Sequence, residues 1–296
     1  MNIVVLGPGA IGSLWAYHLN HAGHRVSVWA HSHEPRIEIK IDNSPSVLLE
    51  NKNVDNLKHA DLVLITVKAW QVETALIPLL SSIHQDAILV FMHNGMGADE
   101  VLPESVKEHP IVYATTSHGA LKSSVGHIRH TGLGKTVLGG KNGQGTQCHF
   151  LADTFNHALS PVEWDHNIVD SLWLKLAVNC IINPLSAIHQ CKNGELLNTQ
   201  YQPIIKQLIE ETYQVMVREG IPHTRQTLTS TIMSVINSTA QNLSSMNRDI
   251  FYRRPTEIDF ITGYLINKAR IHNVAVPQNE KLYNQIKEIE RNKAAK

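Results

Sequence analysis

A lysine and two asparagines stand four residues apart within an otherwise apolar stretch, residues 171–183. In a helix, Lys175, Asn179 and Asn183 would share one face, because each step of four residues turns the side chain by only about 40°. A helix this apolar is normally buried, and burying an ammonium group and two amides is costly unless each finds a partner. The pattern is typical of a polar face that lines a ligand cleft. It also fits a partly exposed helix whose Lys175 extends to water.

The first residues of the chain predict a nucleotide-binding turn. A short apolar strand, 3–6, leads into a glycine-rich turn and a helix that reaches about residue 22, and a second strand follows at 25–30. In this context the glycines permit a tight turn, close approach of a pyrophosphate and packing of helix on strand. The helix N-terminus adds N–H groups and a positive dipole end. The expected cofactor-binding residues of the turn are Gly7, Pro8, Gly9, Ala10, Ile11 and Gly12.

The end of the second strand favours NADP over NAD. An NAD site commonly has an acid there that accepts a hydrogen bond from the ribose 2′-hydroxyl, but the first acid here, Glu34, comes late. Without that acid a 2′-phosphate meets no repulsion, and the following residues could donate to it: His31, Ser32, His33 and Arg36. The alternative is that these residues form a solvated loop.

Two further polar residues follow buried strands of the predicted sheet. Lys68 comes directly after the apolar run 61–67, and Asn94 follows the run 88–92. Ligands of doubly wound sheets bind outside the carboxyl ends of the strands. We therefore expect Lys68 and Asn94 to be site residues.

The remaining pattern predicts an α/β protein with an N-terminal Rossmann-type dinucleotide-binding domain, 1–166, and an all-α domain, 167–296. Short strands expected to extend the sheet in antiparallel fashion lie at 111–116, 125–130 and 136–139, before a helix at 150–158 and a strand at 162–164. Beyond residue 168 the sequence predicts helices alone, at 202–219, 226–241, 256–271 and after Pro277. Pro184 is expected to kink or end the helix that carries Lys175.

Composition narrows the class of protein. Lys plus Arg and Asp plus Glu both number 26, so no basic excess points to nucleic acid. The three cysteines form no CxxC pair, which favours a reducing cytoplasm, and no apolar run approaches the roughly 18 residues of a membrane span. His18, His21 and His24 stand three apart, but no motif supports a metal site, and exposed helix histidines are the preferred interpretation.

A nicotinamide domain followed by a lysine-bearing polar face suggests hydride transfer to a carbonyl. Reduction of a ketone needs a proton donor for the developing alkoxide, and the Lys175 ammonium can serve as general acid and stabilise that charge. The same charge would attract a substrate carboxylate.

The chain resembles the ketopantoate reductase (2-dehydropantoate 2-reductase) family. The resemblance rests on segments that occur in the family's order over almost the whole chain: 7–12, 67–71, 93–97, 174–185, 244–246, 256–259 and 272–277. It implies NADPH-dependent reduction of 2-dehydropantoate to (R)-pantoate in pantothenate biosynthesis.

The resemblance also implies residue roles. Lys175 would be the general acid and Glu257 would hydrogen-bond the substrate hydroxyl. Asn179, Asn183 and Ser245 would hold substrate oxygens, with Asn94 and Lys68 at the nicotinamide end. One position departs from the family, which commonly has an arginine where His31 stands. Since histidine ordinarily titrates near pH 6.5, we expect a weaker preference for NADPH that improves below about that pH.

Other interpretations stay open at this point. The chain could be a dehydrogenase of another small keto or hydroxy acid on the same plan, or a non-catalytic sensor of the NADP redox state. The Lys175 face argues against a sensor, which needs no proton donor. No helix shows a sustained coiled-coil seam, so the oligomeric state, a homodimer included, is also left open.

Overall fold

The computed structural model describes residues 1–124 and 126–294; Val125, the first residue of one expected strand, lies outside them. The chain forms two compact units. The first comprises Met1–His93 and Ala98–Ser171, and the second Asn94–Gly97 and Leu172–Lys296. The expected domain boundary after residue 166 stays a prediction. The grouping of Asn94–Gly97 with the helical unit was not expected from the sequence.

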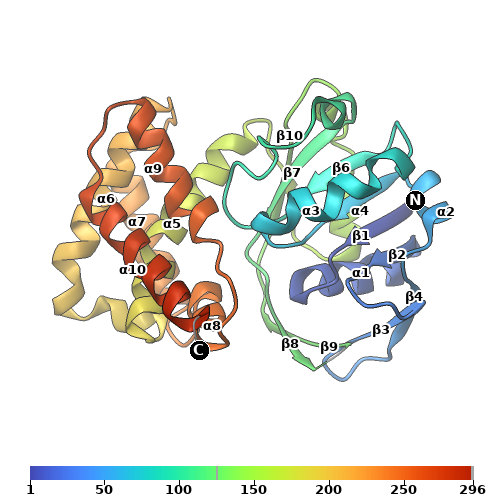
Figure 1. Cartoon of the computed structure of the whole chain (residues 1–296), viewed down its shortest axis with the longest axis horizontal. Helices are drawn as coiled ribbons and strands as arrows, with labels where there is room; N and C mark the ends of the chain where they lie inside the picture. Colours follow the sequence, from blue (N-terminus) through green and yellow to red (C-terminus); the bar gives the residue numbers. More distant parts are fainter. Residues whose placement is uncertain (125, 295–296) are drawn as a thin grey trace. The chain divides into compact units, whose positions relative to one another are not determined.

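The main sheet of the first unit is mostly parallel and has the strand order β11-β10-β7-β6-β5-β1-β2. Figure 1 labels its strands β10, β7, β6, β1 and β2. Strands β2, β1, β5, β6 and β7 pair in parallel, β10 runs antiparallel to β7, and β11 is parallel to β10. The strands are β1 (Asn2–Leu6), β2 (Arg25–Trp29), β5 (Leu62–Ile65), β6 (Ile88–Phe91), β7 (Ile111–Thr116), β10 (Thr136–Gly140) and β11 (Val162–Trp164). Every residue of β5 and β6 is buried, as expected for strands covered on both faces. The predicted α/β class with a Rossmann-type N-terminal domain is confirmed.

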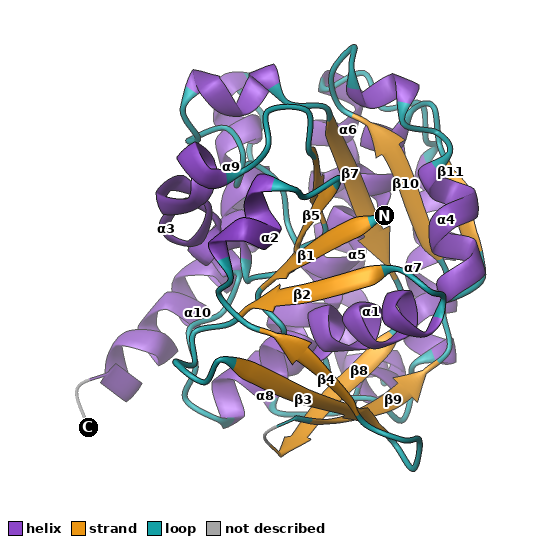
Figure 2. Cartoon of the chain, turned by 90° about the vertical axis from the view of Figure 1, so that its right-hand side faces the viewer, coloured by secondary structure: helices purple, strands orange, loops and turns teal. Residues whose placement is uncertain are grey.

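A second sheet of the first unit was missed by the sequence reading. Its order is β4-β3-β9-β8, and Figure 2 shows these strands at the bottom of the view, beside α1. The strands are β3 (Arg36–Ile41), β4 (Val47–Glu50), β8 (Gly119–Ser124) and β9 (His127–Gly132). The expectation that the strand near 125–130 extends the main sheet was wrong, because β9 pairs with β3 and β8 instead. Residues 36–41 of β3 alternate charged and apolar side chains, which is typical of a half-buried strand, so the sequence could have revealed β3. The sequences of β8 and β9 show no such regular alternation.

Four α-helices lie wholly within the described part of the first unit: α1 (Ala10–His21), α2 (Val54–Lys58), α3 (Val72–Leu76) and α4 (Leu151–Ala158). The fully buried Trp15 of α1 packs against the fully buried Phe155 of α4, with ring centroids 5.0 Å apart. This contact belongs to the apolar core that fixes α1, and hence the turn before it.

His18 does not project into solvent, contrary to expectation. Its ring faces that of His130 at a centroid distance of 6.4 Å, and the Nδ1 atom of His118 lies 3.1 Å from Nε2 of His130. Burial, followed by the nearby His130, His21 and His118, lowers the pKa of His18 to about 4. The described residues contain no group of metal-ligating side chains with the geometry of a metal site.

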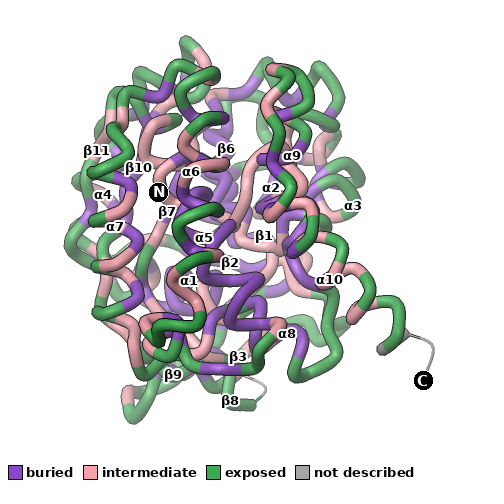
Figure 3. The backbone as a smooth tube through the Cα atoms, turned by 90° about the vertical axis from the view of Figure 1, so that its left-hand side faces the viewer, coloured by how far each residue is buried: buried purple, intermediate pink, exposed green. Residues whose placement is uncertain are grey.

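The second unit is built from helices, as predicted. They are α5 (Ile168–His189), α6 (Gln202–Arg218), α7 (Arg225–Ser238), α8 (Ser245–Phe251), α9 (Thr262–Ile271) and α10 (Pro277–Ala294). Helix α5 contributes Trp173, Leu176, Cys180 and Ile181 to the core, each at most 1% exposed. The burial of each part of the chain can be followed in Figure 3. The expected helix at 256–271 instead divides into the short 3-10 turn Ile258–Phe260 and α9.

Pro184 does not end α5, which continues to His189. A proline inside a helix costs about 3 kcal/mol, because it removes one hydrogen bond and crowds the preceding turn. The neighbouring Ile181, Ile182 and Leu185 are all buried, so packing of this segment offsets that cost.

Helix α5 is long and apolar enough to pass a length-and-composition test for a membrane span, and it alone does so within the described residues. Of its most apolar window, 67% is buried inside the structure. That is the behaviour of a core helix, which passes the same test.

Candidate active site

The glycine turn of the first unit has the shape that a dinucleotide requires. A Cβ on Gly12 would lie 2.3 Å from Thr66 Oγ1 and 2.4 Å from the carbonyl oxygen of Gly7, so only glycine allows α1 to approach β1 and β5 this closely. A Cβ on Gly9, by contrast, would meet nothing nearer than 3.9 Å. Gly9 caps α1 without a side-chain hydrogen bond, which leaves the helix N-terminus open to an anion. The residues therefore fit the pyrophosphate of a dinucleotide.

Pairing of β1 with β5 brings the segment that carries Lys68 beside the glycine turn. Residues of β1 and β5 pair in register up to Leu6 and Ile65, and Thr66 Oγ1 donates to the carbonyl oxygen of Gly7 at 2.8 Å. Lys68 follows two residues later and is half-buried, and its backbone N–H donates to Gln71 Oε1 at 3.2 Å. The expected position of Lys68, beyond the carboxyl end of a strand beside the glycine turn, is the one observed.

A buried asparagine shapes the loop after β2, and sequence reasoning missed it. Asn51 is 6% exposed; its Oδ1 accepts from the backbone N–H of Ala30 at 2.9 Å. Its Nδ2 donates to the carbonyl oxygens of Ser32 at 3.1 Å and Glu34 at 2.7 Å. No local motif signals this role, because Asn51 is brought to the loop by a bridge to Val28.

His31 lies exposed in that loop, and the side chain of Lys52 lies beside it. The Lys52 ammonium donates to the carbonyl oxygen of His31 at 3.2 Å. A positive charge therefore stands beside the residue that was expected to meet the 2′-phosphate.

In the second unit, the structure brings Asn94, Lys175 and Glu257 together. Asn94 Nδ2 donates to Glu257 Oε2 at 3.1 Å, across a separation of 163 residues. Glu257 is only 3% exposed. Burial lowers the pKa of the Lys175 ammonium to about 8, although the nearby Glu257 carboxylate raises it. This cluster joins a hydrogen-bonding amide, a carboxylate and a cation that can give up a proton near neutral pH.

A glycine sets the contact between Asn94 and Glu257. Gly95 has φ +81°, and a Cβ there would lie 2.4 Å from the carbonyl oxygen of Phe260. The N–H of Met96 donates to that same oxygen at 2.9 Å. Residues 94–97 therefore lie directly on the turn that follows Glu257, which explains why they group with the helical unit.

The other residues predicted on α5 lie along the same helix. Lys175 and Asn179 are half-buried and Asn183 is 7% exposed, whereas Leu176 and Cys180 between them are at most 1% exposed. The spacing of four residues within one unbroken helix puts the three polar side chains on one face, as predicted.

Ser245 is the exposed first residue of α8, and a buried network fixes that end of the helix. Ser244 caps α8 by accepting from the N–H of Asn247 at 3.0 Å. Ser186 Oγ of α5 donates to Ser244 Oγ at 2.7 Å, and Asn247 Nδ2 donates to the carbonyl oxygen of Ser186 at 2.7 Å. These bonds join the start of α8 to α5, and the sequence gave no sign of Asn247.

Two family models match the chain. The model described as "Ketopantoate reductase PanE/ApbA" covers residues 3–143, and "Ketopantoate reductase PanE/ApbA C terminal" covers 167–290. The chain belongs to the ketopantoate reductase family. A curated 2-dehydropantoate 2-reductase from Vibrio cholerae is 53% identical over 98% of both chains. One from Escherichia coli O157:H7 is 39% identical over 97% of this chain and 94% of its own length.

Solved structures agree with this ketopantoate reductase assignment. A probable 2-dehydropantoate 2-reductase from Bacillus subtilis is 28% identical, with a TM-score of 0.80 over 97% of this chain and 99% of its own. A ternary structure of D-mandelate dehydrogenase with NADH and anilino(oxo)acetate has a TM-score of 0.89 at 23% identity, covering 99% of this chain and 100% of its own. The second likeness concerns the fold alone.

Proposed function

We propose that this member of the ketopantoate reductase family reduces 2-dehydropantoate to (R)-pantoate with NADPH, in pantothenate biosynthesis. The observation that carries the proposal is the cluster of Lys175, Glu257 and Asn94 in the helical unit. Full-length relatives bearing the name 2-dehydropantoate 2-reductase, at up to 53% identity among those cited, support it.

Lys175 acts as the general acid. Bound NADPH supplies the hydride that reduces the ketone carbon, and Lys175 Nζ donates the proton that the developing alkoxide needs. A pKa of about 8 keeps this amine mostly protonated at pH 7 while making it a better proton donor than an ordinary lysine. Its positive charge also stabilises the oxygen as negative charge develops there.

Glu257 and the amides bind the keto acid. The Glu257 carboxylate accepts a hydrogen bond from the substrate hydroxyl, and since an ionised carboxylate offers about four acceptor positions, it can do so while Asn94 donates to Oε2. Asn179, Asn183 and Ser245 hold substrate oxygens, because amide and hydroxyl groups bind them without competing for the proton of Lys175. Asn94 also contributes to the nicotinamide end.

The first unit binds the cofactor. The pyrophosphate would be held by the turn formed by Gly7, Pro8, Gly9, Ala10, Ile11 and Gly12. Lys68 would bind the nicotinamide end and His31 the 2′-phosphate. The open space at Gly9 and the uncapped start of α1 support this assignment.

The first test is an assay of purified protein. Mixing it with 2-dehydropantoate and NADPH should cause rapid loss of the NADPH absorbance. The absorbance should fall slowly when NADH replaces NADPH, or when pyruvate replaces 2-dehydropantoate. If NADPH binds but no keto acid is reduced, the proposed reaction is wrong, while the assignment of the nucleotide site survives.

The cofactor site should depend on His31 and on the ammonium group beside it. We expect His31→Ala to raise the KM for NADPH, because the imidazole can donate a hydrogen bond to the 2′-phosphate. Lys52→Met should also weaken NADPH binding, since the Lys52 ammonium lies beside His31.

Fluorescence titration with NADPH and NADH checks this cofactor prediction without turnover. Arg25→Met, an exposed change on β2, is the matched control. A KM for NADPH that is insensitive to His31→Ala would show that His31 has no part in binding the phosphate.

The reaction should lose rate in alkaline solution. Because Lys175 must carry its proton, kcat/KM for the keto acid should fall above about pH 8, approaching tenfold per pH unit. Lys175→Arg keeps a positive charge throughout this range, so its residual activity should lack that limb. A wild-type profile that stays level to pH 10 would contradict the role of Lys175.

We also propose that the protein acts in the cytoplasm. Cys148, Cys180 and Cys191 form no disulfide and are all buried, which suits a reducing compartment.

We further propose that the protein forms a homodimer. A solved structure with the description "dimeric Ketopantoate Reductase from Staphylococcus aureus" shares the fold with a TM-score of 0.83. Sedimentation equilibrium tests the dimer, and a monomer at micromolar concentration would refute it.

A further inference from the structure

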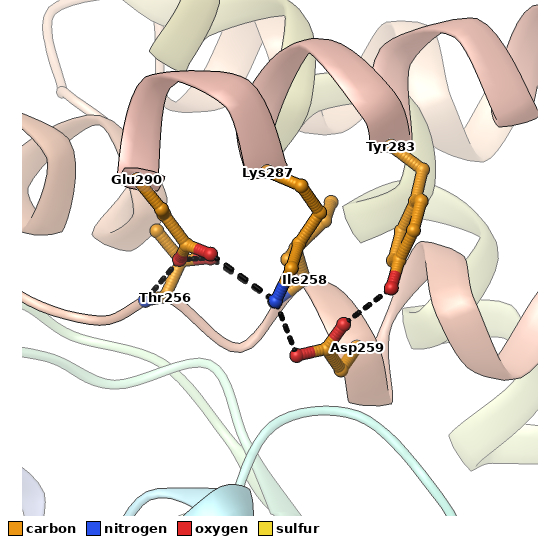
Figure 4. Close-up of polar contacts among 6 residues, drawn as sticks. All are labelled: Thr256, Ile258, Asp259, Tyr283, Lys287 and Glu290. Atoms are coloured by element: carbon orange, nitrogen blue, oxygen red, sulfur yellow. Dashed lines mark hydrogen bonds and ion pairs between the residues drawn. The ribbon is translucent and has the colours of Figure 1, made fainter. Parts of the chain in front are cut away.

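Helix α10 holds the segment that carries Glu257. Tyr283 Oη donates to Asp259 Oδ1 at 2.6 Å, and Lys287 Nζ donates to Asp259 Oδ2 at 2.9 Å (Figure 4). Asp259 comes two residues after Glu257, so these bonds fix the C-terminal flank of the glutamate. Tyr283 and Lys287 are four residues apart and therefore share one face of α10.

The N-terminal flank of Glu257 is fixed by the same helix. Glu290 Oε1 accepts two hydrogen bonds from Thr256, one from its backbone N–H and one from its hydroxyl, both at 2.8 Å (Figure 4). Thr256 is only 4% exposed. Lys287 Nζ also lies 3.3 Å from Glu290 Oε2, so one ammonium joins the two anchoring carboxylates.

These contacts differ from ordinary surface ion pairs. The side chains of Lys287 and Glu290 are 27% and 18% exposed, and Glu290 binds a backbone N–H directly, so the network constrains main chain and not only side chains. Burial lowers the pKa of Lys287, but its hydrogen bond to Asp259 and the charges of Asp259 and Glu290 raise it overall. The Lys287 cation is therefore favoured in this position.

We infer that Tyr283, Lys287 and Glu290 of α10 are positioning residues that orient Glu257 and thereby set the preference for a keto acid that carries a hydroxyl group. This inference rests on the proposed function, in which Glu257 binds the substrate hydroxyl. It adds a role for the C-terminal helix, whose side chains reach the site through Thr256 and Asp259 rather than by contacting the substrate.

The physical reason is that Glu257 stands between two anchored neighbours. Its carbonyl oxygen accepts from the N–H groups of Phe260 at 3.1 Å and Ile261 at 3.0 Å, which forms the turn after it. Without the α10 anchors this turn can shift relative to Lys175, and a displacement of about 1 Å is enough to weaken a hydrogen bond strongly. Lys175 lies on α5, so proton donation should be less affected than binding of the hydroxyl.

The test compares two substrates that differ in that hydroxyl. We would measure kcat and KM for 2-dehydropantoate and for 3,3-dimethyl-2-oxobutanoate, which has a methyl group in place of the hydroxymethyl group. In Lys287→Met and Tyr283→Phe the ratio of the two kcat/KM values should fall by about fivefold or more, through the KM for 2-dehydropantoate. The Kd for NADPH, measured by fluorescence, should stay within about twofold of wild type.

Two controls separate positioning from general loss of stability. Arg225→Met removes the exposed pair with Glu210 at 3.1 Å elsewhere in the helical unit, and should leave the substrate ratio unchanged. Glu290→Gln retains an acceptor for Thr256, so it should preserve more of the ratio than Glu290→Ala. Melting temperatures of all variants show whether the fold persists.

A double-mutant cycle gives the decisive comparison. If Lys287 acts through Glu257, then Lys287→Met should change the substrate ratio little when Glu257→Ala, which removes the acceptor, is already present. Equal losses for both substrates, an unchanged ratio in the α10 variants, or full additivity with Glu257→Ala would each overturn the inference. A wild-type enzyme that shows no preference for the hydroxylated keto acid would instead overturn the proposed role of Glu257 and the inference with it. One that reduces neither keto acid would overturn the proposed function.

Discussion

Replacing Lys175 by alanine is expected to lower kcat for reduction of 2-dehydropantoate by at least about 100-fold while NADPH still binds. The methyl group of alanine can neither donate a proton to the ketone oxygen nor stabilise negative charge there. Burial of Lys175 makes the loss larger than at a wet surface, since electrostatic effects strengthen when water is excluded. Steady-state assays give kcat, and fluorescence titration gives the Kd for NADPH.

A second variant on the same helix face shows whether the loss of turnover is specific to Lys175. Asn179→Ala removes a polar side chain one turn further along α5, and should raise the KM for the keto acid more than it lowers kcat. Near-normal turnover in Lys175→Ala would exclude Lys175 as the general acid. The polar face of α5 would then be a binding surface only.

The parts of the site that local pattern can reveal were predicted from the sequence. The glycine turn depends on a strand, a turn and a helix that are adjacent in the chain, and the face of Lys175, Asn179 and Asn183 depends only on helical period. Both follow from geometry within a few residues. The family resemblance then added Glu257 and Ser245, which no local pattern distinguishes from helix-end residues.

Contacts between distant segments were beyond this reasoning. Nothing near Asn94 indicates that it joins the helical unit, because that placement depends on Gly95 meeting the carbonyl oxygen of Phe260. Asn51 likewise reaches the loop after β2 through strand pairing. The charged residues of α10 resemble ordinary surface charge in sequence, and their role becomes visible only when the fold places Thr256 and Asp259 beside them.

Two expectations about the fold failed for different reasons. The alternating sequence of β3 is typical of a half-buried strand and could have revealed it, whereas the pairing of β3 with β9 depends on residues far apart in the chain. Pro184 was expected to kink or end α5 because local propensity disfavours proline inside a helix, and α5 does not end there. Packing of the buried residues around Pro184 outweighed this local preference.

Replacing Glu257 by alanine is expected to raise the KM for 2-dehydropantoate by about tenfold or more, with little change in the Kd for NADPH. The variant loses the acceptor for the substrate hydroxyl and leaves the Asn94 amide without the partner that it has at 3.1 Å. Initial rates over a range of keto acid concentrations at saturating NADPH measure the effect. Unchanged substrate kinetics would leave Glu257 as a helix-end residue.

The same variant should also move the alkaline limb of the pH profile. The Glu257 carboxylate raises the pKa of Lys175 against the larger effect of burial, so removing it should lower that pKa below about 8 and shift the limb toward neutral pH. Glu257→Gln separates the two contributions, because glutamine can still accept from Asn94 but carries no charge. We expect it to shift the limb as alanine does while raising the KM less. A limb that stays in place in both variants would show that Glu257 does not set the protonation of Lys175.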